Sequence, residues 1–209
     1  MMNKFDINSW NRKAQYEFFK NYNDPFFNLT TNIDVTGLYN YCKEKNISFF
    51  LACLHYALET ANEILEFRLR IIDDQVYEFD SIDIGSTVLN DDNSFPFCHF
   101  EKQESILKFE SSGKEVLKKH QENKYFVSNK DIINVIYASS IPWISFTSIK
   151  HARDIEREKS GIPKFVFGKY FKEDNYLNMP FSIEVHHALI DGYHVGKFIE
   201  NFQKRIDNL

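Results

Sequence analysis

The succession of a strand, a polar turn and a helix near the C-terminus constrains the fold of this chain more than any other feature. Residues 181–187 alternate apolar and polar side chains, as a strand does. Asp191 and Gly192 end this run. An amphipathic helical pattern then places apolar side chains at Val195, Phe198, Ile199, Phe202 and Ile206. A strand that leads into an amphipathic helix predicts that the helix packs on a sheet.

The rest of the chain mixes both patterns. We expect helices over residues 8–18, with Asn8 or Ser9 as the cap, over Thr36–Lys45, from Ser48 to about Ala61, and over 107–120. Strands are expected at 67–72, 75–79, 132–138, 143–149 and 165–170. Together these predict an α/β fold: a two-layer sandwich of a mixed β-sheet with helices on one face. With 7 Gly, 5 Pro and no linker-like segment, residues 1–209 are expected to form one domain.

Charge and cysteine content narrow the function classes. The formal net charge is −5, so no global positive field attracts nucleic acid. No apolar stretch approaches the roughly 18 residues of a membrane helix, and no signal peptide begins the sequence. The three cysteines form no C-x-x-C pair, which fits a reducing compartment. We therefore expect a cytoplasmic protein without a nucleic-acid or membrane partner.

Two adjacent histidines, His186 and His187, close the C-terminal strand pattern. Because side chains alternate along a strand, His187 should share the apolar side with Val185, and His186 should point the other way. An imidazole on an apolar surface resists protonation, and a neutral imidazole is the form that removes a proton from a hydroxyl or a thiol. His187 is therefore a candidate general base; a hydrogen-bonded core histidine is the alternative.

Two further interpretations concern the residues that follow. His187, Asp191 and His194 have the i, i+4, i+7 spacing of ligands on one helix face, which would suit zinc. Asp191-Gly192 and the preceding strand pattern argue against a continuous helix, so no metal is expected. Asp191 either orients His187, as in a catalytic triad, or pairs with a distant arginine such as Arg12 and fixes the turn.

Several ordered blocks carry a resemblance to a known family. His186 to Gly196 reads HHALIDGYHVG, which resembles the HHxxxDG signature of type A chloramphenicol acetyltransferases and related acyl-CoA-dependent acyltransferases. The signature is shared with the acyltransferase cores of 2-oxo acid dehydrogenases and with condensation domains. Residues 139–148, SSIPWISFTS, resemble the S-x-x-P-W-x-x-F-x-S block of the first family. Its W-x-R appears at Trp10 to Arg12, and Gly168-Lys169-Tyr170 and Met179-Pro180 occur in the expected order.

This resemblance implies an acetyl-CoA-dependent O-acetyltransferase that acts on chloramphenicol or a related small molecule. His187 matches the general base, and Ser148 matches the serine that hydrogen-bonds the oxyanion of the intermediate. Asp191 and Arg12 match a salt bridge that supports the site. Phe19 and Phe27 lie where the family places acceptor-pocket aromatics. The resemblance also implies a homotrimer with active sites between subunits, with acetyl-CoA as co-substrate and no metal.

One departure concerns the acceptor. Val166 occupies the position of a family threonine whose hydroxyl helps to hold a water molecule near the intermediate, and valine has no such donor. We assign Val166 to the substrate site on this basis. Acyl transfer to another acceptor, such as lipoamide, a non-catalytic ligand-binding homologue, and a zinc hydrolase are the alternatives.

Overall fold

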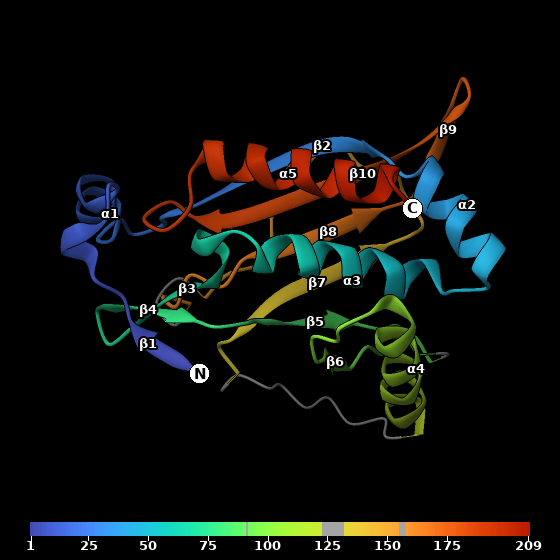
Figure 1. Cartoon of the computed structure of the whole chain (residues 1–209), viewed down its shortest axis with the longest axis horizontal. Coiled ribbons are helices and arrows are strands. Elements are labelled where there is room, and N and C mark those ends of the chain that lie inside the picture. The colour runs from blue at the N-terminus through green and yellow to red at the C-terminus, as the bar shows by residue number, and fades with distance from the viewer. Residues whose placement is uncertain (91, 123–131, 155–157) are drawn as a thin grey trace.

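The computed structural model describes residues 1–209 except residues 91, 123–131 and 155–157. Its centre is a mixed seven-stranded sheet with the order β2-β10-β8-β7-β5-β6, and β9 pairs with β10 beside this path. Helices α3 and α5 lie across one face of this sheet (Figure 1). This arrangement confirms the predicted sandwich. The strands are β2 (Phe26–Asp34), β5 (Asp83–Thr87), β6 (Phe97–Phe100), β7 (Val135–Ile141), β8 (Lys164–Gly168), β9 (Phe171–Glu173) and β10 (Tyr176–His186).

The helical layer agrees closely with the sequence pattern. Helix α3 is buried on nearly all sides, as its continuous apolar character predicts, and the Ser48 hydroxyl caps it by accepting from the Leu51 N–H. On α5, the predicted Val195, Phe198, Phe202 and Ile206 are buried. None of the described helices is long and apolar enough to cross a membrane. The helices are α1 (Lys13–Phe19), α2 (Thr36–Lys45), α3 (Phe49–Asn62), α4 (Ile106–Glu122) and α5 (Gly192–Asp207), with 3-10 turns η1 (Ile7–Ser9) and η2 (Leu65–Arg68).

A small three-stranded sheet includes the N-terminal strand β1. Strand β4 (Gln75–Phe79) pairs with both β1 (Met2–Lys4) and β3 (Leu69–Ile72). The predicted two-residue hairpin turn is present, with φ of 48° at Asp73 and 58° at Asp74. Both residues adopt the left-handed conformation that a type I′ turn requires. The predicted strand over residues 67–72 begins only at Leu69, because Phe67 and Arg68 belong to η2.

Strand β10 is covered on both faces. Phe181, Ile183 and Val185 are buried, as expected, but Ser182 and Glu184 on the opposite side are buried too. Part of this second cover comes from the segment that follows β7, since the Arg153 guanidinium contacts the Glu184 carboxylate. The C-terminal end of this internal strand leads directly into the histidine pair.

Two predicted elements are wrong. Residues 143–149 alternate like a strand, yet none of them belongs to a strand and most of them are exposed. Pro142 has no N–H with which to continue the ladder, and the parallel strands β7 and β8 already pair directly. The expected helix over 8–18 is split into η1, capped by the Asp6 side chain, and α1.

Candidate active site

The turn after β10 holds the histidine pair. The strand ends at His186, one residue earlier than predicted. The carbonyl of His186 accepts from the N–H groups of Leu189 at 3.0 Å and Ile190 at 2.9 Å, so the chain curls back at once. The N–H of His187 donates to the carbonyl of Pro25 at 2.8 Å, which ties the turn to the residue before β2. The backbone of His187 is therefore fixed by two strands.

The His187 ring lies against two predicted acceptor-site aromatics. It stacks on Phe19 with a centroid distance of 3.9 Å and an interplanar angle of 7°. Phe27 lies 4.7 Å from it at 52°. Phe27 pairs in register with Val185, so the ring is on the side of the sheet that the parity argument predicted. The buried Nδ1 of His187 has no hydrogen-bond partner among the described residues.

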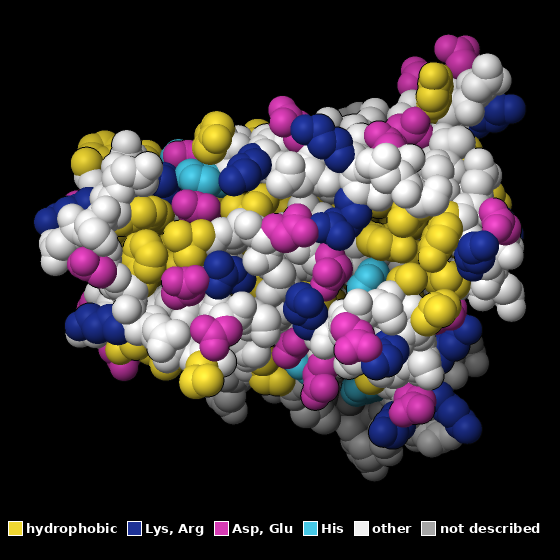
Figure 2. All heavy atoms as spheres, in the orientation of Figure 1, with side chains coloured by type: hydrophobic (Ala, Val, Ile, Leu, Met, Phe, Trp, Pro, Cys, Tyr) yellow, Lys and Arg dark blue, Asp and Glu magenta, His cyan; other side chains and the backbone are white. Residues whose placement is uncertain are grey.

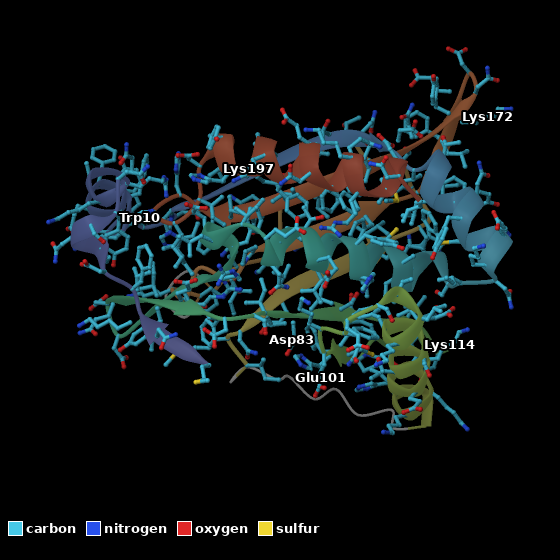
Figure 3. The ribbon with its side chains drawn as sticks, in the orientation of Figure 1. Trp10, Asp83, Glu101, Lys114, Lys172 and Lys197 are labelled. Atoms are coloured by element: carbon cyan, nitrogen blue, oxygen red, sulfur yellow. The ribbon has the colours of Figure 1, made fainter. Side chains whose placement is uncertain are left out.

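Arg12 binds the backbone of the turn that follows β10. Its side chain is 7% exposed, and its Nε donates to Asp191 Oδ2 at 3.1 Å. Its Nη1 donates to the Leu189 carbonyl at 2.6 Å and its Nη2 to the His187 carbonyl at 3.3 Å. The guanidinium also lies 5.1 Å from the ring centroid of Trp10, labelled at the α1 end of the molecule in Figure 3. The ion pair expected between Arg12 and Asp191 is thus present, with carbonyl contacts that the sequence did not reveal.

Asp191 serves as the N-cap of α5 rather than as a partner of His187. Its carboxylate accepts from the N–H groups of Tyr193 and His194, and the His194 side chain completes a capping box. Burial alone would raise the pKa of Asp191, but His194, Arg12 and the two N–H groups outweigh it and lower that pKa. The Nε2 of His194 lies 3.4 Å from Glu66 Oε1. Glu66 was not predicted, because nothing in its spacing relates it to His194.

The two histidines of the pair have different environments. His186 is 2% exposed, and its Nδ1 accepts from the Ala188 N–H at 3.2 Å. Burial, with smaller effects of Arg153 and His187, lowers the pKa of His186 to about 4. His186 is therefore a neutral, hydrogen-bonded residue of the interior. His187 precedes α5, so His187, Asp191 and His194 do not share a helix face, and the zinc spacing loses its geometric basis.

Ser148 belongs to the segment between Phe146 and Lys150. Its side chain is exposed in the segment after β7, and among the described residues no hydrogen bond joins it to His187. Upstream of it, a Cβ atom at Gly168 would approach both Phe146 and Pro180 to 3.0 Å, which places this segment near the start of β10. Downstream of Ser148, Lys150 Nζ lies 3.9 Å from Asp24, which precedes Pro25, and the Pro25 carbonyl accepts from the His187 N–H, so the segment extends toward the end of β10 that leads to His187.

A cavity of about 320 Å³ opens beside the segment that carries Ser148. Its lining is mostly apolar and includes Cys53 of α3 and the exposed Trp143. The sequence did not predict this cavity, because its walls come from α3 and from the ends of four strands. The lining residues are Phe49, Phe50, Cys53, Thr87, Val88, Leu89, Ser140, Pro142, Trp143, Phe167, Gly168, Lys169, Tyr170 and Met179.

Val166 lies inside the sheet. It is fully buried, between Ser139 of β7 and Ser182 of β10 in the sheet register, and it does not line the cavity. Its assignment to the substrate site stays a prediction. In contrast, the surface next to Phe19 is apolar, since Phe18 is 62% and Tyr22 46% exposed. Figure 2 shows hydrophobic side chains gathered at this α1 end of the molecule.

Comparisons with known proteins match the whole arrangement. The family model described as chloramphenicol acetyltransferase matches residues 1–203. A chloramphenicol acetyltransferase of Clostridium butyricum is 33% identical, over 97% of this chain and 93% of the relative. One of Clostridium perfringens is 32% identical, over 99% and 95%. A solved chloramphenicol acetyltransferase structure has a TM-score of 0.91 at 28% identity, covering 99% of this chain and all of the other.

These matches fix the class and then the family. The protein is an acyltransferase with the sandwich fold of that class. It belongs to the chloramphenicol acetyltransferase family.

Proposed function

We propose that the protein transfers the acetyl group of acetyl-CoA to a hydroxyl of chloramphenicol or of a related small molecule. One observation carries this proposal: the His187 ring is clamped between Phe19 and Phe27 at a turn that Arg12 and Pro25 hold rigid. A base held in one place beside an apolar surface suits deprotonation of an alcohol on an aromatic acceptor. The names of the relatives support chloramphenicol as the first acceptor to test.

The proposed chemistry assigns one role to each residue. His187 takes the proton of the acceptor hydroxyl while that oxygen attacks the thioester carbonyl. The Ser148 hydroxyl donates to the oxyanion of the tetrahedral intermediate. The intermediate then expels the CoA thiolate, which receives the proton from His187. Arg12 and Asp191 act only through the turn, which they hold in shape.

We further propose a homotrimer in which His187 of one subunit meets Ser148 of the next. The exposure of Ser148 supports this, because an exposed serine that is not hydrogen-bonded to the base within the described residues is free to face a neighbouring subunit. The exposed aromatic surface at α1 fits the same scheme, since large apolar patches often mark interfaces. Residues 1–209 would then form one acyltransferase domain per subunit.

We assign acetyl-CoA to the cavity beside Trp143. Its apolar lining suits the uncharged arm of the co-substrate, and Lys169 at the cavity offers a cation for a phosphate. The cavity opens beside the Ser148 segment, so a thioester bound there would lie next to the proposed oxyanion donor. A cytoplasmic location is proposed as well, supported by three buried free cysteines.

Thiol release tests the proposal directly. The purified protein is incubated with acetyl-CoA and chloramphenicol, and free CoA is followed with a thiol reagent, with other hydroxylated acceptors in parallel. The His187→Ala variant should lose transfer while remaining folded, because no other group takes the proton. His99→Ala is the matched control, since His99 pairs with Asp83 on the far edge of the sheet. Full activity of a folded His187→Ala variant would contradict the assignment, and drug binding without turnover would indicate a binding protein.

A further inference from the structure

A buried cluster of charged side chains lies on the sheet face opposite the helices. Arg153 and Glu184 expose only 5% and 4% of their side chains. Glu158 accepts from both Arg153 and Lys164, so two acidic and two basic groups balance one another. Taking such charges out of water costs several kcal/mol per ion. The need to fill space therefore does not explain why these buried side chains are charged.

Arg153 joins three segments of the chain. Its Nε donates to Glu184 Oε1 at 2.8 Å, and its Nη2 lies 2.6 Å from the same oxygen. Its Nη1 donates to Glu158 Oε2 at 3.1 Å. The guanidinium carbon lies 3.2 Å from the ring centroid of Phe26. One planar cation thus connects the segment after β7 to both β10 and β2, as arginine does better than lysine.

Two of these contacts adjoin the backbone that carries His187. Glu184 lies in β10, two residues before His186. Phe26 packs edge-on against His186 with a centroid distance of 4.8 Å. Phe26 also follows Pro25, whose carbonyl accepts the His187 N–H. Any shift of Arg153 would therefore reach the two strands that together fix the His187 backbone.

Arg153 also belongs to the segment that carries Ser148. Downstream of Ser148, Lys150 is 80% exposed and its Nζ lies 3.9 Å from Asp24, so this pair holds the segment weakly. Arg153 is the next basic residue that is anchored, and it is anchored in the interior. It therefore ties the chain after Ser148 to the strands that deliver His187.

We propose that Arg153 is a positioning residue for acyl transfer, which sets the His187 turn through Glu184 and Phe26 and anchors the segment of Ser148. The inference rests on the proposed function. Stability alone does not explain the pair, because replacing a buried ion pair by apolar side chains is often neutral or stabilising. Placement does explain it, since a displacement of about 1 Å at a reacting group costs about 10²-fold in rate.

The test compares Arg153→Met, Glu184→Met, the double variant and Arg153→Lys. For each, kcat, KM for both substrates and the urea midpoint of unfolding are measured. Arg153→Met should lower kcat by about 10- to 100-fold and change KM less than about 3-fold. The double variant should regain much of the lost stability, since no unpaired charge stays buried, but kcat should stay low. Arg153→Lys should regain part of kcat, because it keeps the charge but not the planar fork.

The controls separate this inference from the proposed function. Arg205 lies on α5 and forms a surface ion pair with Glu63. Arg205→Met removes this ion pair and should leave kcat unchanged. If the wild type turns over and the double variant regains both its stability and its kcat, then Arg153 has only a structural role. Unchanged kcat in Arg153→Lys and Arg153→Met would overturn the inference while leaving the proposed function intact. A wild type without turnover would overturn both. If Arg153→Met does not fold, Arg153→Lys and the double variant decide by the same criteria.

Discussion

At the residue scale, burial distinguishes His187 from two histidines of the interior. His187 is partly buried and keeps an unpartnered ring nitrogen at the end of a strand. His55 and His186 are 5% and 2% exposed, and burial lowers the pKa of each to about 4. The sequence separated His186 from His187 by strand parity, but His55 gave no signal at all, because a histidine within an apolar helix reads as an ordinary core residue.

These two lowered pKa values predict that the folded protein loses stability in acid, at pH values above those at which carboxylates usually titrate. Between about pH 6.5, the unperturbed value, and about pH 4, unfolded chains bind protons that the folded protein excludes. Stability therefore falls as the pH drops through that window, and it is unaffected by these residues above it. His55→Phe should lose about 1 to 2 kcal/mol less stability between pH 7 and pH 5 than the wild type does. Urea unfolding at both pH values measures this, and parallel losses in the two proteins would refute it.

At the element scale, the sequence predicted the structure where periodicity and local capping agree. Helices α2, α3 and α5 were found because an apolar face or a capping serine marks each of them. Strands β2 and β5 were missed, since Phe26–Asp34 carries exposed polar residues and Asp83–Thr87 is short. Residues 143–149 misled the prediction, because alternation alone does not supply a neighbouring strand with free N–H and carbonyl groups.

The β3–β4 hairpin offers a prediction at the same scale. Asp73 and Asp74 both have left-handed backbone angles, of 48° and 58° in φ, which L-residues adopt at a cost. Glycine adopts this conformation freely, so Asp74→Gly should raise stability by about 0.5 to 1 kcal/mol without changing kcat. Asp74→Ala is the control and should lower stability, because alanine keeps the Cβ and loses the local polar contacts of the aspartate. Thermal unfolding of the three proteins checks the order, and a less stable glycine variant would contradict it.

At the scale of the whole molecule, no hydrogen bond joins Ser148 to His187 among the described residues of one chain. Arg12 binds both His187 and Asp191 at the C-terminal end of β10, whereas the Ser148 side chain is exposed in the segment after β7. No sequence pattern states which distant residues act together, so the family resemblance, and not spacing, joined Ser148 to His187. The cavity beside Trp143 escaped prediction for the same reason, since its walls come from separate elements.

Subunit mixing tests this division of the site. His187→Ala and Ser148→Ala should each be nearly inactive as pure proteins, the second by about 10²- to 10³-fold. When the two variants are unfolded together at equal concentration and refolded, about a quarter of the sites in random closed trimers should pair an intact His187 with an intact Ser148 from the neighbour. Activity should therefore rise to about a quarter of the wild-type value on refolding, although neither protein supplies it alone. Mixing without unfolding is the control, because preformed trimers exchange no subunits. If both residues acted within one subunit, no mixture would contain an intact site, and co-refolded protein as inactive as its components would exclude the shared site.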